Sequence, residues 1–291
     1  MTFIALPMSA DSAAYLDEEA PLHQELASRG LRFTTPIWDD PSVDWSQFDA
    51  VLIRTTWDYV EKLAAYEAWL ERVDRLTRLF NPLPIVRWNL RKRYLAQLDA
   101  AGVPCIPTVW LAPGGGPDLS RILAERGWER AFLKPEIGAT ASGTLRFNTD
   151  PAGLDQARAH LARHHTDMLL QPYLSAVETE GELSLMFFEG RFSHAFRKLP
   201  VPGDYRVQRE HKATDHAVPA QAGERALAER VLEAARGLSG GDPLYARVDL
   251  LRDARGELRV TELEMVEPSL FLHHAPQGAA PLVTALLARL G

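Results

Sequence analysis

Carboxylates at alternating positions gather near the C-terminal end of the chain, within residues 244–268. Asp249 lies in one apolar run, Glu262 and Glu264 lie in the next, and Glu267 follows closely. Side chains on a strand change face at every residue, so pairing of the two runs would bring three carboxylates together. Crowded carboxylates repel one another unless a cation lies between them. Oxygen donors without Cys or His suit a hard ion such as Mg²⁺, which often bridges carboxylates and phosphates. The alternative is a hairpin with one solvated acidic face.

A lysine and a loop of small residues form a second chemical pattern. Lys134 ends the apolar run 131–133 in a chain whose positive charge is mostly arginine. The loop Ile137–Thr144 follows, and its Gly138, Ser142 and Gly143 leave backbone N–H groups open. Such a loop can close over phosphates. A plain hairpin turn is the alternative.

Cationic side chains collect on and after a predicted hairpin. Arg197 and Lys198 end its second strand, and Arg206 and Arg209 lie in the loop that follows. In a chain of net charge −7, such a group suggests an anionic substrate or a transferring phosphate. A solvated charge run is the alternative.

The segment RTTWDY offers groups that could hold an amino acid. It follows a predicted strand, where ligands dock in open α/β sheets. Arg54 could take a carboxylate, Asp58 an ammonium, and Trp57 could form a wall, with Thr56 beside them. The alternative is a capped helix start with Thr55, Thr56 or Asp58 as the N-cap residue.

The elements that must position these groups follow from apolar periodicity and from glycine and proline breaks. Residues 1–86 are expected to form a small α/β unit. In it we expect strands at 3–6, 31–33 and 50–54, and helices at 11–29 and 62–79. Asn89 should cap a helix that carries Lys92 and ends at Gly102. The later helices are expected at 118–126, 151–165, 221–238 and 284–290, and the later strands at 105–111, 168–174, 183–188, 191–199, 244–251 and 258–265. His160, His164 and His165 are expected at a solvated helix end.

Bulk properties exclude several classes of protein. The chain has 291 residues, too many for one small core, and 46% are hydrophobic, as in ordinary globular proteins. The net charge and a pI near 5.7 argue against a nucleic-acid or membrane surface. Cys105 is the single cysteine and is expected to be a buried structural thiol. Without disulfides, signal peptide or membrane span, we expect a cytoplasmic protein.

The order of these features resembles the ATP-grasp ligases over about residues 85–270. Lys92, Lys134 with its loop, QPYL, a following Glu, Asp249 and Glu262-x-Glu264 occur in family order. The branch of prokaryotic glutathione synthetase and the ribosomal-protein-modifying glutamate ligases is the most similar. This resemblance implies an α+β fold in which two subdomains grip ATP, after a small α/β N-terminal domain. The expected domains are residues 1–86, 87–170 and 171–291.

The resemblance also implies roles for single residues. Lys92 and Lys134 would hold phosphates, with Ile137–Thr144 as a lid, and Glu182 or Glu178 would hold the ribose. The adenine would be lined by Gln171, Tyr173 and Leu174. The Mg²⁺ ligands would be Asp249, Glu262 and Glu264, with Glu264 where the family usually has Asn.

The implied cofactors are ATP and two Mg²⁺ ions, with Mn²⁺ as a substitute. Arg247 could reach the γ-phosphate. Arg206 and Lys198 would act on the acid or the transferring phosphate, and Arg54 would help to orient the acid.

Four phrases narrow the resemblance further. RTTWDY, WNLRKRYL, GDYRVQ and YARVDL are together most similar to the O-ureidoserine cyclo-ligases of cycloserine biosynthesis. The leading hypothesis is an ADP-forming ligase or cyclo-ligase that activates a small amino-acid-like carboxylate as an acyl phosphate. A phosphotransferase and a non-catalytic nucleotide-binding regulator are the alternatives. The expected partner is a small molecule, with no nucleic acid or membrane, and the oligomeric state stays open, a homodimer included.

Overall fold

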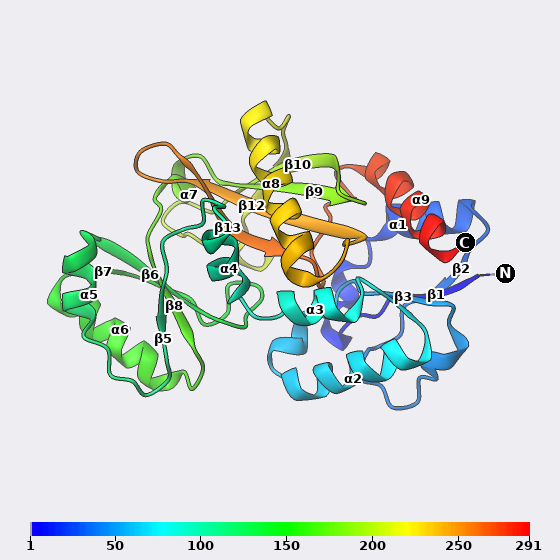
Figure 1. Cartoon of the computed structure of the whole chain (residues 1–291), viewed down its shortest axis with the longest axis horizontal. Helices are drawn as coiled ribbons and strands as arrows, with labels where there is room; N and C mark the ends of the chain where they lie inside the picture. Colours follow the sequence, from blue (N-terminus) through cyan, green and yellow to red (C-terminus); the bar gives the residue numbers. More distant parts are fainter. Residues whose placement is uncertain (1) are drawn as a thin grey trace.

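Three sheets follow one another along the molecule in the computed structural model, which describes residues 2–291 (Figure 1). An N-terminal sheet lies at one end, a sheet with two covering helices lies at the other, and the largest sheet lies between them. None of the helices in this part of the chain is both long and apolar enough to cross a membrane.

The N-terminal sheet is parallel, with strand order β2-β1-β3-β4. Its elements are β1 (Phe3–Ala5), α1 (Ala20–Ser28), β2 (Arg32–Thr34), β3 (Ala50–Leu52), α2 (Leu63–Leu76) and β4 (Arg78–Phe80), with 3-10 turns at Ala10–Tyr15, Trp45–Gln47 and Trp57–Val60. Three strands were expected here and are confirmed. The expected helix over 62–79 is confirmed as α2, but it ends at Leu76, because Thr77 is extended and Leu79 and Phe80 are buried in a fourth strand. The expected helix over 11–29 is likewise divided, into a 3-10 turn and α1.

The sheet at the far end is antiparallel, in the order β5-β8-β6-β7. Its elements are β5 (Val109–Leu111), α5 (Leu119–Arg126), β6 (Arg130–Pro135), β7 (Leu145–Asn148), α6 (Pro151–Arg163) and β8 (Met168–Pro172). Helix starts are fixed by carboxylates, since Asp118 and Asp150 accept hydrogen bonds from backbone N–H groups in the first turns of α5 and α6. Both helices pack on the sheet through a shared apolar core. β6 thereby carries Lys134 toward the middle of the molecule.

The middle sheet is antiparallel, in the order β11-β10-β9-β12-β13. Its strands are β9 (Glu182–Phe188), β10 (Arg191–Leu199), β11 (Thr214–Ala217), β12 (Tyr245–Arg252) and β13 (Leu258–Glu264), and its helices are α3 (Leu83–Asn89), α4 (Tyr94–Ala100), α7 (Ala176–Thr179) and α8 (Ala222–Ser239). Ala246, Val248 and Leu250 belong to the core that packs on α3, α4 and α8. Because strand side chains alternate, Arg247 and Asp249 lie on the opposite face.

Two asparagine side chains fasten the chain after β4 to the middle sheet. The Asn81 amide donates to the Tyr245 and Met265 carbonyl oxygens, at 2.9 and 2.7 Å, and its oxygen accepts from the Leu244 N–H. Asn89 bonds Leu263 O and Met265 N in the same way. Asn89 therefore does not cap a helix as expected. It ends α3, a helix that was not expected, and the expected helix begins only at Tyr94, after a turn at 90–93.

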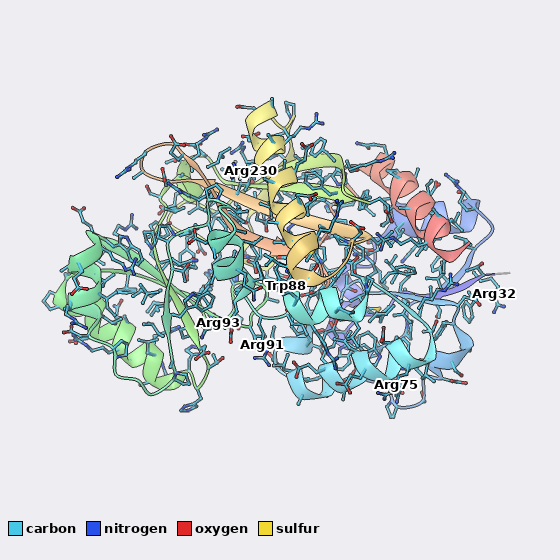
Figure 2. All side chains as sticks on the ribbon, viewed as in Figure 1. Arg32, Arg75, Trp88, Arg91, Arg93 and Arg230 are labelled. Carbon is cyan, nitrogen blue, oxygen red and sulfur yellow. The ribbon has the colours of Figure 1, made fainter. Side chains whose placement is uncertain are left out.

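The last helix, α9 (Ala279–Leu290), returns to the N-terminal unit. It packs on α1, and Leu282, Val283 and Leu286 share a core with Ile4 and Leu22 (Figure 1). Near the other junction, Arg93 (labelled in Figure 2) donates to Glu136 and Asp167, which ties the start of α4 to the far sheet. The middle sheet is therefore fastened to the N-terminal unit on one side and to the far sheet on the other.

Candidate active site

The predicted pairing of the two acidic strands is confirmed. β12 and β13 are antiparallel, with Arg247 opposite Glu264 and Asp249 opposite Glu262. A register shift directly follows Asp249, which is common where a strand re-aims its side chains next to a site. Both pairs line one cavity, so the sheet brings the three carboxylates together with a guanidinium.

Asp249 is the most buried of the three carboxylates, at 2% exposure. Ser184 Oγ donates to its Oδ1 at 2.5 Å, Arg247 Nε donates at 3.0 Å, and Lys198 Nζ lies 3.5 Å from Oδ2. Burial alone would raise the pKa of Asp249, but Arg247 and then Lys198 outweigh it and hold the pKa at about 2. Asp249 is therefore ionised across the physiological pH range.

Glu264 has the opposite electrostatic environment. Burial raises the pKa of Glu264 to about 7, and the neighbouring Glu262 and Asp249 add to the rise against the opposing effect of Arg247. Burial, and then Glu264, raise the pKa of Glu267 to about 8. The pKa of Glu262 is instead lowered, since Lys92 and Lys134 outweigh its burial. The four carboxylates therefore differ in charge state: the pKa values of Asp249 and Glu262 are lowered, and those of Glu264 and Glu267 are raised.

Two lysines reach this cluster from different elements. Lys92 lies in the turn between α3 and α4 and not on a helix as expected. Its Nζ contacts Glu262 Oε1 at 2.9 Å and donates to Gly138 O at 2.8 Å. Lys134, at the end of β6, donates to Thr261 O at 3.1 Å, and burial lowers its pKa. Both ammonium groups are buried beside the carboxylates, and ammonium groups can donate charge-assisted hydrogen bonds to phosphate oxygens.

The small-residue loop 137–144 joins β6 to β7 above these lysines. Thr140, Ala141 and Gly143 have positive φ, so backbone groups rather than bulky side chains shape the loop. The His160 ring nitrogen Nε2 lies 2.8 Å from Gly143 O, and His160 is 8% exposed. The expected solvated position of His160 is therefore wrong, because this histidine is buried and contacts the backbone of the loop.

Two cavities meet at the carboxylate cluster. The first has a volume of about 160 Å³ and the second about 550 Å³. Among the expected residues, the first cavity is lined by Lys92, Lys134, Gly138, Ser142, Gln171, Tyr173, Leu174, Glu182, Lys198, Arg206, Arg247, Asp249, Glu262 and Glu264. The second cavity shares the wall residues Lys198, Arg247, Glu262 and Glu264 and extends to Trp57, Arg209 and Glu267.

Part of the RTTWDY segment lies elsewhere, which corrects the expected substrate clamp. Arg54 is 2% exposed and donates to both carboxylate oxygens of Glu19 at 2.8 Å. Thr56 bonds the Tyr66 hydroxyl, and Asp58 accepts from Trp38 Nε1 and Lys62. Each is held by its own partner and lines neither cavity among the described residues.

The expected cationic group also divides. Arg197 lies on the face of β10 opposite Lys198 and faces Glu224, 3.7 Å away, so it lines neither described cavity. Arg206 lines the first cavity but is paired with Asp204 at 2.7 Å, and Arg209, in the second cavity, is paired with Glu18.

Two further expected residues lie off the cavity walls. Of the two ribose candidates, Glu182 contacts Lys198 at 2.7 Å within the first cavity, whereas Glu178 binds Arg146 outside it. Gly143 belongs to the loop without lining either described cavity.

Several residues that line the second cavity were not predicted from the sequence. Tyr15, Glu18, Asp215, His273 and His274 line the second cavity. They come from a 3-10 turn, an edge strand and a turn after β13, so no periodic pattern singles them out. The adjacent histidines in the charge-free stretch 268–288 were the one signal available.

Comparison with known proteins gives one full-length relative and close structural matches. The model of the family "D-cycloserine synthetase DcsG, N-terminal domain" matches residues 4–81. The chain is 37% identical over 307 residues to the cycloserine biosynthesis protein DcsG of Streptomyces lavendulae, covering 100% of this chain and 99% of the relative. The crystal structure of D-cycloserine synthetase DcsG matches with a TM-score of 0.90 and 35% identity, over 99% of this chain and 100% of that one.

More distant solved structures share the fold. The ATP-grasp ligase PsnB complexed with its minimal precursor has a TM-score of 0.64 at 18% identity, over 99% of both chains. D-alanyl-alanine synthetase A of Vibrio cholerae has a TM-score of 0.73 at 15% identity, over 99% of this chain and 98% of that one. The expected ATP-grasp fold is confirmed by these matches.

Proposed function

Because this chain belongs to the DcsG family of ATP-grasp ligases, enzymes that form C–N bonds, we propose that it closes a D-cycloserine-like ring. The substrate would be a linear amino-acid-like acid that carries its own nitrogen nucleophile. ATP would activate the carboxylate as an acyl phosphate.

The observation that carries this proposal is the shared wall of the two cavities. Lys198, Arg247, Glu262 and Glu264 line both of them. A nucleotide in the first cavity and an acid in the second would therefore meet at one place, which is rich in charge. Reacting groups held at such a place react as parts of one molecule, and this lowers the entropic barrier.

The donor set fits Mg²⁺. Asp249, Glu262 and Glu264 supply carboxylate oxygens in one cavity, and no Cys or His is among the described residues that line it. These three residues would hold the metal. When bound, the metal would neutralise phosphate charge and withdraw electron density from the transferring phosphoryl group.

The remaining wall residues would bind and orient the nucleotide. Lys92 and Lys134 would contact phosphate oxygens, and loop 137–144 would cover them. The ribose would bond to Glu182. The adenine would lie against Gln171, Tyr173 and Leu174, where the first cavity is lined by β8 and the residues after it.

Lys198 and Arg247 would stabilise charge as the phosphoryl group moves. A carboxylate oxygen of the substrate attacks the γ-phosphorus and ADP leaves. The nitrogen then attacks the carbonyl carbon and loses its proton, and phosphate departs with the former carboxylate oxygen. These steps need no nucleophilic side chain.

The test is a product assay with ATP, Mg²⁺ and O-ureidoserine of either configuration. Mass spectrometry is expected to find ADP, phosphate and a ring-closed product in equal amounts, and added hydroxylamine should divert the acyl phosphate to a hydroxamate. Glu262→Gln should abolish turnover, whereas Glu257→Gln, on the exposed turn between β12 and β13, should not change it. A stable phosphorylated product, or full activity of Glu262→Gln, would contradict the proposal.

A further inference from the structure

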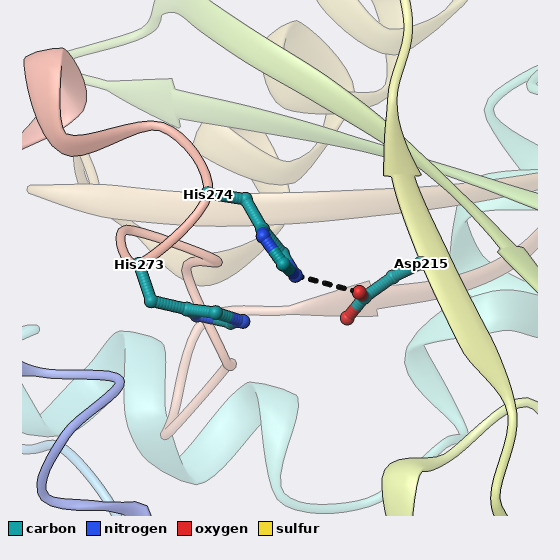
Figure 3. A group of neighbouring side chains, drawn as sticks. All are labelled: Asp215, His273 and His274. Atoms are coloured by element: carbon teal, nitrogen blue, oxygen red, sulfur yellow. Dashed lines mark hydrogen bonds and ion pairs between the residues drawn. The ribbon is translucent and has the colours of Figure 1, made fainter.

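Three potential metal ligands converge in the wall of the second cavity, away from the carboxylate cluster. One donor atom from each of Asp215, His273 and His274 lies within 4.8 Å of the other two. His274 Nε2 is 2.8 Å from Asp215 Oδ1, and the ring centroids of His273 and His274 are 3.9 Å apart. Figure 3 shows the far edges of both rings pointing toward the Asp215 carboxylate.

The backbone holds this group in place. Asp215 lies on β11 opposite Lys198 of β10, and cross-strand partners share a sheet face, so it extends the active-site face by one strand. The histidines lie in a turn after Phe271, which has a φ of 51°, and His274 N bonds Phe271 O at 3.1 Å. This turn puts consecutive side chains on one side, where sequence neighbours on a strand would diverge.

A carboxylate lies behind one of the histidines. Glu18 Oε2 is 3.9 Å from His273 Nδ1, and this nitrogen is buried without a hydrogen-bond partner among the described residues. A histidine that binds metal through one nitrogen almost always donates its other N–H to a carboxylate or carbonyl. Glu18 lies where such an acceptor is needed.

The charge around the cluster favours a cation. Glu18, Glu210 and Asp215 are three carboxylates of the second cavity, and Arg209 is the guanidinium bound to Glu18. Tyr15 donates its hydroxyl to Glu210 at 2.6 Å without adding charge. This part of the cavity therefore carries excess negative charge.

We propose that Asp215, His273 and His274 bind a divalent transition-metal ion of the Zn²⁺ type, distinct from the ion held by the carboxylate cluster. Two imidazole nitrogens and one carboxylate oxygen suit such an ion better than Mg²⁺, which prefers oxygen alone. Three protein ligands leave a coordination position that faces the cavity. In the proposed ligase that position would take a nitrogen or oxygen atom of the substrate, and this last role alone rests on the proposed function.

Metal binding is tested on the full chain after dialysis against a chelator, with Mg²⁺ in excess to occupy the carboxylates. Titration with Zn²⁺ by calorimetry is expected to give one ion per chain, and Co²⁺ should give the visible absorption of a four-coordinate complex. His274→Ala and Asp215→Ala should abolish the Co²⁺ spectrum. Glu18→Gln should weaken Zn²⁺ binding by about 10–100-fold. His211→Ala is the matched control, because His211 lies four residues before Asp215 and lines neither described cavity.

Three outcomes would overturn the proposal: no Zn²⁺ binding, equal binding by wild type and His274→Ala, or binding that Glu262→Gln removes and His274→Ala does not. Unfolding curves of each variant separate lost binding from a lost fold. Zn²⁺ binding without ring closure would leave this site standing and refute the proposed function. Ring closure without Zn²⁺ binding would support the proposed function and refute the proposed Zn²⁺ site.

Discussion

Replacing Glu264 by glutamine should stabilise the metal-free protein at alkaline pH. Burial raises the pKa of Glu264 to about 7 from the 4.5 of an ordinary glutamate, and the neighbouring Glu262 and Asp249 add to the rise. At 1.36 kcal/mol per pKa unit, holding Glu264 ionised in the folded chain costs about 3 kcal/mol. Glutamine removes the charge but keeps an oxygen that can accept the hydrogen bond from Arg247.

The sign of the pH dependence follows from proton linkage. A carboxyl group with a raised pKa binds more protons in the folded chain than in the unfolded chain, so its contribution to stability falls as the pH rises. For Glu264 this fall extends from about pH 4.5 to about pH 7. Glu264→Gln should therefore exceed wild type by up to about 3 kcal/mol at pH 8 and match it near pH 4.5.

Urea unfolding with a chelator and without nucleotide measures this difference at both pH values. Glu257→Gln is the control, because Glu257 is exposed on the turn after β12, and its effect should stay within about 0.5 kcal/mol. Adding Mg²⁺ and ATP should reverse the order, because wild type gains binding energy that the variant lacks. A Glu264→Gln protein no more stable than wild type at pH 8 would contradict the claim that ionised Glu264 destabilises the folded chain.

Three further substitutions test the frame of the site. Lys134→Met should weaken ATP binding by about 10–100-fold, the value of a hydrogen bond to a charged group, as measured by calorimetry; unchanged affinity would remove Lys134 from the phosphate site. Gly143→Ala should lower stability by about 1 kcal/mol in thermal unfolding, because φ is +69° and the new Cβ would lie 3.2 Å from the His164 ring; an unchanged melting temperature would contradict it. Asn81→Ala should cost roughly 2–4 kcal/mol in urea unfolding, since it leaves backbone groups of Leu244, Tyr245 and Met265 without their partner; a smaller loss would mean that water replaces the amide.

Sequence reasoning succeeded where one local rule decides the outcome. The alternation of β12 and β13 placed Asp249, Glu262 and Glu264 on one face, and the structure has that face. The same rule divides Arg197 from Lys198, which occupy successive positions on β10 and therefore point to opposite faces. Grouping the two by charge alone ignored this, so only Lys198 reaches the cavity.

Prediction from the sequence failed where the contacts of a residue depend on a partner that is distant in the sequence. Arg54 has the right type and position for a carboxylate ligand, but its guanidinium donates to both carboxylate oxygens of Glu19, a residue that no periodicity links to it. Asn89 reads as a helix cap until β13, more than 170 residues later, supplies backbone groups for its amide. A single sequence gives no information about such pairs.

The lining of the second cavity was harder to predict from the sequence than the lining of the first. The residues proposed to contact nucleotide and metal come mostly from strands and from the loop after β6, and such residues can be found from their spacing in the sequence. The proposed substrate end is assembled from Tyr15 and Glu18, from β11 and from the turn at 273–274. These parts meet because α9 packs on α1, which brings the C-terminal region of the chain back to the N-terminal unit. If the second cavity takes the substrate as proposed, substitutions at the packing contact between α1 and α9 should alter substrate affinity before they alter ATP affinity.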